Sequence, residues 1–212
     1  MKKQLCPKCK SSLFQRWARE GSPFAEWMCP VCGYSAHELE SRMYVCWLCS
    51  GKTLVHLKDE VKDYWWCVDC LKPGIAPELA VRLEALPLPG KMEYAANCLN
   101  NYCFAINVKD KSLNQLISHL MSMRIYKKDY FKWEQACESL ELKGRGAPLP
   151  SSLRRKIPAE KLCAFIKLYE NCLEVGRTGI ADNAGIWPVH HLKICIGILQ
   201  DEKVELPKFH HI

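Results

Sequence analysis

The sequence predicts an α+β protein in which two small N-terminal four-cysteine zinc ribbons precede a mainly α-helical domain. The motif Cys-x-x-Cys occurs four times within the first 70 residues. The arm between the first two motifs breaks at Gly-Ser-Pro, as a β-hairpin does, whereas apolar residues recur at helical spacing after residue 90. The predicted domains are a first ribbon at 1–35, a linker helix, second ribbon and following helix at 36–89, and a mainly helical basic domain at 90–212.

The cysteines of these four motifs have the spacing of zinc ligands. Nineteen residues separate the first two motifs, and seventeen separate the last two. Each motif forms a tight knuckle that offers two thiolates, and two knuckles complete the closed tetrahedral site of structural zinc. We therefore predict two Zn²⁺ ions, shared either by consecutive knuckles or in a cross-braced arrangement (knuckles one and three, two and four). The predicted ligands are Cys6, Cys9, Cys29, Cys32, Cys46, Cys49, Cys67 and Cys70.

The two ribbons look like copies of one module. Their leading knuckles are offset by 40 residues and their trailing knuckles by 38. Trp27 and Trp65 each stand two residues before a trailing knuckle, and Phe14 and Leu54 each stand five residues after a leading one. The match beyond cysteine favours a duplicated hairpin module.

Composition and the first residues of the chain limit the class of protein that we expect. With 49% apolar residues, a 212-residue chain is expected to fold. The first residues lead straight into a knuckle, so we expect no export signal, and no apolar run approaches the roughly 18 residues of a membrane span. Fourteen cysteines in such a chain indicate metal-bound thiolates in a reducing compartment. We therefore expect a cytoplasmic protein, or a nuclear one if the source is eukaryotic, with no membrane partner.

Helical signals connect and follow the ribbons. The segment 35–38, Ser-Ala-His-Glu, reads as a capping box that opens a linker helix to about residue 43. Another helix is expected from Pro77, ending at the domain boundary at 87–90. In the last domain we expect a helix at 92–101, a short strand at 102–108, a helix capped by Ser112, one from Asp129 to Gly144, one from Pro158 to Gly176, and a last one from Pro188.

The formal charge of +7 favours an anionic partner, and nucleic acid is the leading candidate for a basic protein with zinc modules. Cations beside a tryptophan near the first hairpin tip suit phosphate contacts plus base stacking. Further cations lie between two expected helices and in a Gly/Pro-rich loop at 143–156, where flexible side chains can neutralise phosphates. The predicted nucleic-acid-binding residues are Arg16, Trp17, Arg19, Arg124, Lys127, Lys128, Lys132, Arg145, Arg154, Arg155 and Lys156.

The same residues have simpler interpretations. Trp17 can pack over the small ribbon core, and the basic segments can be solvated surface or linker. The second hairpin arm carries mixed charge at 58–63, which favours contact with protein over nucleic acid. The competing function is therefore an adaptor or transcription regulator that docks on a polymerase or another subunit through its ribbons.

The patterns of zinc enzymes and nucleotide-binding loops do not fit. Four thiolates leave no open coordination position for a reactive water. Zinc deaminases use His-x-Glu, whereas His37 is followed two residues on by Leu39. A phosphate-binding loop ending at Gly51-Lys52 would need glycine where Cys46 stands. We expect a non-enzymatic protein with no small-molecule substrate.

Two resemblances point to nucleoprotein assemblies. The first ribbon, with Cys-Pro-Lys-Cys, a tryptophan two residues before the next pair, and Cys-Pro-Val-Cys-Gly-Tyr, resembles the zinc ribbons of RNA-polymerase small subunits and transcript-elongation factors over residues 6–34. In layout, the whole chain resembles the zinc-finger large subunit of type IV CRISPR effector complexes. That resemblance implies contacts with guide RNA and target DNA, other protein subunits as partners, and antiviral defence. The second ribbon departs from the single zinc finger of that family.

Overall fold

The computed structural model describes residues 5–18, 24–40, 42–126, 129–181 and 186–208. The chain forms two compact units, Met1–Arg82 and Leu83–Ile212, here called the ribbon unit and the helical unit. The ribbon unit holds the cysteine knuckles on an antiparallel sheet and the other unit is mainly helical, which confirms the predicted α+β class. The division falls within helix α1 (Pro77–Ala85), ahead of the boundary predicted at 87–90.

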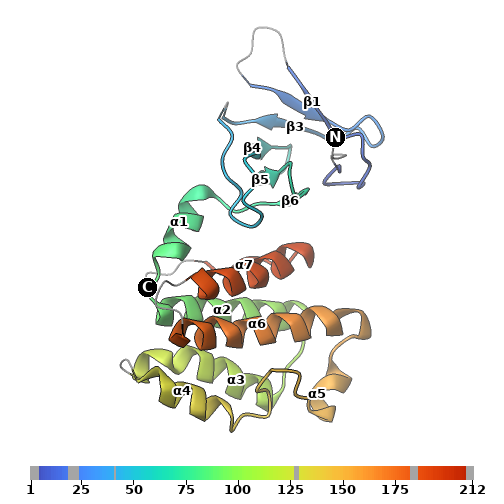
Figure 1. Ribbon diagram of the computed structural model, residues 1–212. Helices are drawn as coiled ribbons and strands as arrows, with labels where there is room; N and C mark the ends of the chain where they lie inside the picture. The colour runs from blue at the N-terminus through green and yellow to red at the C-terminus, as the bar shows by residue number, and fades with distance from the viewer. Residues whose placement is uncertain (1–4, 19–23, 41, 127–128, 182–185, 209–212) are drawn as a thin grey trace. The chain divides into compact units, whose positions relative to one another are not determined.

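A six-stranded antiparallel sheet forms the ribbon unit, with its strands in chain order (Figure 1). The first ribbon contributes three strands and the second contributes three, and each third strand follows a trailing knuckle. Pairing of β3 with β4 joins the two ribbons into one sheet, a repeat that agrees with the predicted duplication. The strands are β1 (Gln15–Trp17), β2 (Glu26–Met28), β3 (Ser35–Glu38), β4 (Leu54–Lys58), β5 (Asp63–Cys67) and β6 (Lys72–Pro73).

The linker helix predicted at 35–43 is wrong, because this segment contains strand β3. Ala36 and Glu38 are buried while His37 is exposed, which is the period-two pattern of a strand. Strand β2 pairs with one edge of β3, and strand β4 pairs with the other edge. The backbone N–H and C=O groups of this segment therefore bond to neighbouring strands, where a helix would bond them within the segment itself. The Glu38 carboxylate binds Arg16 and Trp27 instead of turning back to cap a helix.

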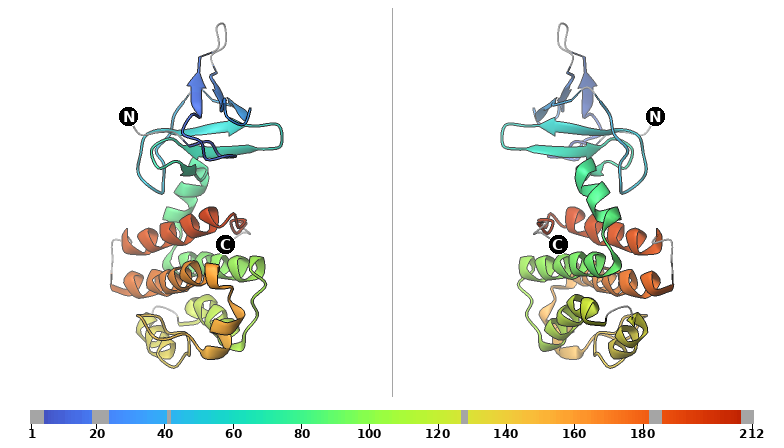
Figure 2. Two further views of the ribbon diagram at one scale, coloured as in Figure 1. Left: turned by 90° about the vertical axis from the view of Figure 1, so that its right-hand side faces the viewer. Right: turned by 90° about the vertical axis from the view of Figure 1, so that its left-hand side faces the viewer.

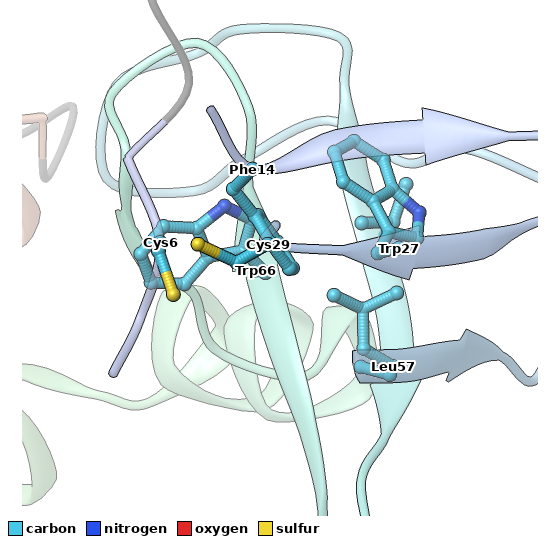
Figure 3. Packing of buried hydrophobic residues seen from close by; sticks show 8 residues of the cluster. Cys6, Phe14, Trp27, Cys29, Leu57 and Trp66 are labelled. Atoms are coloured by element: carbon cyan, nitrogen blue, oxygen red, sulfur yellow. The ribbon is translucent and has the colours of Figure 1, made fainter. Parts of the chain in front are cut away.

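The two ribbons share one hydrophobic core. Phe14 and Trp27 of the first ribbon, with ring centroids 5.4 Å apart, pack in the same cluster as Leu57 and Trp66 of the second. Figure 3 shows two knuckle cysteines, Cys6 and Cys29, on the side of this cluster where Trp66 and Phe14 lie. Coordination and packing therefore depend on each other in the ribbon unit. The buried cluster consists of Cys6, Phe14, Trp27, Cys29, Ala36, Val55, Leu57 and Trp66.

Helices α2, α6 and α7 pack together at the centre of the helical unit, and α3 and α4 lie beside them (Figures 1 and 2). The apolar stripe predicted for the longest helix is confirmed, since Phe165, Tyr169, Cys172 and Leu173 of α6 are buried. The elements are α2 (Leu88–Ala105), α3 (Lys111–Met121), the 3₁₀ helix η1 (Ser122–Tyr126), α4 (Tyr130–Cys137), α5 (Ser151–Lys156), η2 (Ala159–Lys161), α6 (Leu162–Ala181) and α7 (Ile186–Asp201).

Helix α2 continues through most of the strand predicted at 102–108. Tyr102 and Cys103 are buried, so the β-favouring side chains of this segment pack from a helix. The helix ends in a Schellman motif, in which Asn107 takes a left-handed φ of 54° and donates its N–H to the carbonyl of Phe104 at 3.1 Å. The N–H of Val108 donates to the carbonyl of Cys103 at 2.9 Å. This motif fixes how the chain leaves α2.

Other helix ends in this unit also differ from the prediction. Asp110, not Ser112, caps α3, and its carboxylate accepts a hydrogen bond from the Ser112 N–H at 3.0 Å. Helix α4 begins after Asp129 as predicted but ends at Cys137, well before Gly144. Both errors concern the ends of helices whose existence was predicted correctly.

Gly176 lies inside helix α6 instead of ending it, because the helix packs closely there. An added Cβ would lie 2.6 Å from the Trp133 ring and 3.0 Å from the Met92 sulfur. We expect Gly176→Ala to destabilise the protein by about 1–3 kcal/mol, since overpacking outweighs the better helix propensity of alanine. Gly197→Ala in α7, where nothing lies within 4 Å of an added Cβ, should stabilise it by about 0.5–1 kcal/mol. Denaturant unfolding followed by helical circular dichroism measures both, and the same sign for the two variants would contradict this packing.

Candidate metal centres and basic surfaces

Four backbone turns of one form hold the knuckle cysteines. In each turn the residue after the second cysteine takes a left-handed φ of 60–69° and donates its N–H to the carbonyl of the first cysteine at 2.7–2.9 Å. Glycine adopts this φ without strain, whereas other residues pay about 1–2 kcal/mol. In three of the four knuckles, therefore, a residue other than glycine adopts the left-handed φ that this turn requires. The four left-handed positions are Lys10, Gly33, Ser50 and Leu71.

The eight predicted ligands gather into two clusters, one in each ribbon. The four sulfur atoms of a cluster lie within 4.8 Å of one another, and close Sγ pairs are 3.6–3.7 Å apart. A tetrahedron of zinc–sulfur bonds of about 2.3 Å has edges of about 3.8 Å, whereas a disulfide joins sulfurs at about 2.05 Å. The donor sets fit one Zn²⁺ each, and the cross-braced alternative is wrong. The clusters are Cys6, Cys9, Cys29 and Cys32, and Cys46, Cys49, Cys67 and Cys70.

Each cluster is a closed structural site. Four thiolates fill the tetrahedral positions, and the first cysteine of every knuckle is buried. Thiolates this close repel one another, so they are ionised together only around a divalent cation. Zinc with four thiolates carries a net charge of −2, so two loaded sites lower the formal charge of the chain from +7 to +3. The ribbon unit, with 12 Lys and Arg against 9 Asp and Glu, falls from +3 to −1.

A buried carboxylate, Glu38, braces the first hairpin. Its side chain is 2% exposed and accepts hydrogen bonds from Arg16 Nε at 2.6 Å and Nη2 at 2.8 Å. It also accepts from Trp27 Nε1 at 2.9 Å and from the Ala25 N–H at 3.3 Å. Burial raises the pKa of Glu38, but these hydrogen bonds outweigh burial and bring the pKa below its ordinary value. Sequence reasoning missed this role because it placed Glu38 on a helix.

Two tyrosine hydroxyls connect the ribbons. The Tyr34 hydroxyl donates to Asp59 Oδ2 at 2.8 Å and lies 2.6 Å from the Tyr64 hydroxyl. Burial raises the pKa of Tyr64 to about 12, so its hydroxyl keeps its proton at neutral pH. The other oxygen of Asp59 accepts from the backbone N–H groups of Val61 and Lys62 and orders the second hairpin tip. The tyrosines lie 30 residues apart, and no local pattern in the sequence signals their contact.

Most of the predicted nucleic-acid contacts in the described residues are cations paired with acids of the same unit. Arg16 is paired with Glu38. Trp17 is 56% exposed, so the interpretation that Trp17 packs over the ribbon core is wrong. Arg19, Lys127 and Lys128 lie outside the described residues. The remaining ion pairs are Arg124–Glu93 at 2.9 Å, Lys132–Asp129 at 2.7 Å, Arg145–Glu134 at 3.1 Å and Lys156–Asp110 at 2.6 Å.

One group of predicted cations is extended by residues that the sequence did not single out. The loop predicted at 143–156 ends in helix α5, so its last three cations lie on a helix. Lys156 Nζ donates to the Lys109 carbonyl at 3.1 Å as well as to the Asp110 carboxylate, which brings α5 beside the start of α3. Lys111 and Arg154 form no ion pair within the described residues. The exposed side chains of this "α5 cluster" are Lys109, Lys111, Arg154, Arg155 and Lys156.

The described helices include none that is long and apolar enough to cross a membrane. Comparison of the chain with models of protein families, with curated proteins and with solved structures gave no match. The resemblances to polymerase ribbons and to CRISPR large subunits therefore rest on cysteine pattern and layout alone. The geometry itself establishes two four-cysteine sites, each able to hold a zinc ion, that organise the ribbon unit.

Proposed function

We propose that this chain is a non-enzymatic, zinc-dependent protein that binds nucleic acid within a larger assembly, through the α5 cluster. The observation that carries the proposal is the contact of Lys156 with the Lys109 carbonyl and the Asp110 carboxylate, which brings together two distant segments that carry five exposed cations. Cations gathered in this way attract phosphates without reading base sequence. The segments lie 46 residues apart at the Lys156–Asp110 contact, so the fold builds the surface.

The distribution of charge supports the helical unit as the nucleic-acid-binding part. This unit has 18 Lys and Arg against 14 Asp and Glu, a formal charge of +4, whereas the zinc-loaded ribbon unit carries −1. Arg16, the described cation near the first hairpin tip, is neutralised by Glu38. The ribbons would then contribute structure and docking, and the α5 cluster would contribute phosphate contacts.

A second function, docking on protein through the ribbon unit, is favoured by its exposed apolar side chains. Trp17 and Met28 are 56% and 40% exposed on neighbouring strands, and Val61 at the second hairpin tip is 89% exposed. Apolar side chains on a nearly uncharged unit suit contact with another protein better than contact with phosphate. Purification from the native host tests this: partners retained after nuclease treatment, and lost with Trp17→Ala, would support docking.

Salt dependence tests the nucleic-acid proposal. Lys156 is already paired with Asp110, so four cations of the cluster remain for phosphate contacts. On a single strand, four contacts give a slope of about −2.8 in log affinity against log salt, so affinity should fall about fiftyfold between roughly 50 and 200 mM. Arg154→Ala with Arg155→Ala should weaken binding and reduce the slope by about 1.4. Fluorescence anisotropy of a labelled oligonucleotide measures both quantities.

Arg145→Ala is the matched control, because Arg145 is an exposed cation of the same unit already paired with Glu134 at 3.1 Å. Its loss should change the slope much less than the loss of Arg154 and Arg155. Binding that ignores salt, or no binding to any DNA or RNA, would reject the nucleic-acid proposal in favour of protein docking.

A further inference from the structure

We infer that a groove beside the α5 cluster binds an unstacked base of single-stranded nucleic acid against the ring of Phe104. This inference rests on the proposed nucleic-acid function and assigns it a base-contacting site. The groove lies between the end of α2 and the start of α3, wholly within the helical unit.

The groove has an apolar floor and a polar rim. Its volume is about 360 Å³, within the range of sites that hold small ligands. The floor is formed by Cys103, Val108 and Leu113, which are 2–4% exposed. An apolar floor below a polar rim suits a planar ring with polar edges. The exposed residues of the rim are Asn100, Phe104, Asn107, Lys109 and Asn114.

Phe104 presents its ring to solvent near the end of α2. It is 84% exposed, more than any other aromatic side chain in the described segments. It stands three residues before Asn107, and the carbonyl of Phe104 accepts one of the two hydrogen bonds that close the helix end. The hydrogen-bonded helix end fixes the backbone at Phe104, and stacking on its ring accepts any base.

Three amide side chains line the groove together with Phe104. Asn100 precedes Phe104 by one helical turn, and Asn107 and Asn114 come from the connection and from α3. Within the described residues, these three side-chain amides have no hydrogen-bond partner in the protein. Each offers two donors and an acceptor, the groups that complement the edge of an unpaired base.

The groove is continuous with the phosphate-binding surface. Lys109 belongs both to the groove rim and to the α5 cluster, and its carbonyl accepts the hydrogen bond from Lys156 that joins α5 to this site. A base on Phe104 would therefore place its own phosphates near these cations. In a duplex the bases are stacked inside and their faces are inaccessible, so this combination selects a single strand.

Matched strands with and without bases test the inference on the full-length zinc-loaded protein. The probes are oligothymidylate, oligouridylate and an abasic strand of equal length, all at about 50 mM salt. Wild type should bind the base-containing strands about tenfold more tightly than the abasic strand, and Phe104→Ala should remove this difference without weakening abasic binding. Phe104→Tyr should retain it. Phe131→Ala, which removes a 63% exposed ring from α4, should behave as wild type.

The outcomes separate this inference from the proposed function. Equal wild-type affinity for all three strands, or discrimination that survives Phe104→Ala, overturns the groove assignment while phosphate binding stands. Binding to none of the strands overturns the proposed function and the groove assignment together.

Discussion

Chelating zinc should unfold the ribbon unit while the helical unit stays folded. Structural zinc sites contribute about 10 kcal/mol or more of folding free energy at neutral pH, and here ligands also belong to the hydrophobic clusters. The helical unit has its own core on α2, α6 and α7. Five of the seven tryptophans lie in the ribbon unit, so near-ultraviolet circular dichroism reports this unit, and the helical signal reports the other.

Cysteine variants provide the control for chelation. Cys67→Ser removes a buried ligand of the second cluster and should lower the zinc content by one ion. Cys163→Ser removes an exposed cysteine of α6, outside both clusters, and should leave two ions. An unchanged tryptophan signal in protein stripped of all zinc would show that the metal is not needed for this fold.

Glu38→Ala should destabilise the ribbon unit by about 3 kcal/mol. The change leaves the buried Trp27 indole N–H and the Ala25 N–H without an acceptor, at about 1–3 kcal/mol for each buried group. It also releases Arg16, but this side chain is 40% exposed, so water can solvate it and its share is small. Denaturant unfolding followed through tryptophan fluorescence at fixed free zinc measures the loss.

Glu60→Ala is the matched control, since Glu60 is an exposed glutamate of the same unit and should change stability by less than about 0.5 kcal/mol. The lowered pKa of Glu38 adds a pH signature. A depressed carboxyl pKa gives stability that is present above the pKa of the unfolded chain and is lost as pH falls through the lower folded value. The stability of Glu38→Ala should therefore fall less steeply at acid pH than that of the wild type. Equal losses of stability in Glu38→Ala and Glu60→Ala would contradict the proposed bracing by Glu38.

The zinc ligands were predictable because knuckle chemistry is local. Two cysteines three residues apart form a bidentate unit whatever the structure of the rest of the chain. The intervening arms of 19 and 17 residues suit hairpins. The duplication was also predictable from the sequence, because Phe14 and Leu54 occupy matching positions. Both side chains are fully buried in the structure. The sequence left the pairing of knuckles open, and only the geometry of the sulfur atoms selects consecutive pairs.

The errors arose where tertiary contacts decide the local structure. The segment 35–38 has a helix-start pattern, but two flanking strands recruit it into the sheet. Gly176 looked like a helix end because nothing in the sequence shows that Trp133 packs against it. The segment 102–108 looked like a strand, although the buried faces of Tyr102 and Cys103 continue a helix.

The candidate binding surface was predicted only in part, because ion pairing and proximity depend on the fold. Arg154, Arg155 and Lys156 were recognised from charge, but their neighbours Lys109 and Lys111 were not. Phe104 was not recognised, because its exposure depends on which face of α2 packs against the other helices. An asparagine three residues after an aromatic, at the end of a helix, is the one local clue that the sequence offered.

Counting zinc in two knuckle-deletion variants tests the metal architecture most directly. The first variant replaces both knuckles of the first ribbon by serine, at Cys6, Cys9, Cys29 and Cys32. The second replaces the leading knuckle of each ribbon, at Cys6, Cys9, Cys46 and Cys49. Native mass spectrometry should find two ions in the wild type, one in the first variant and none in the second. One ion in the second variant and none in the first would contradict one closed site per ribbon.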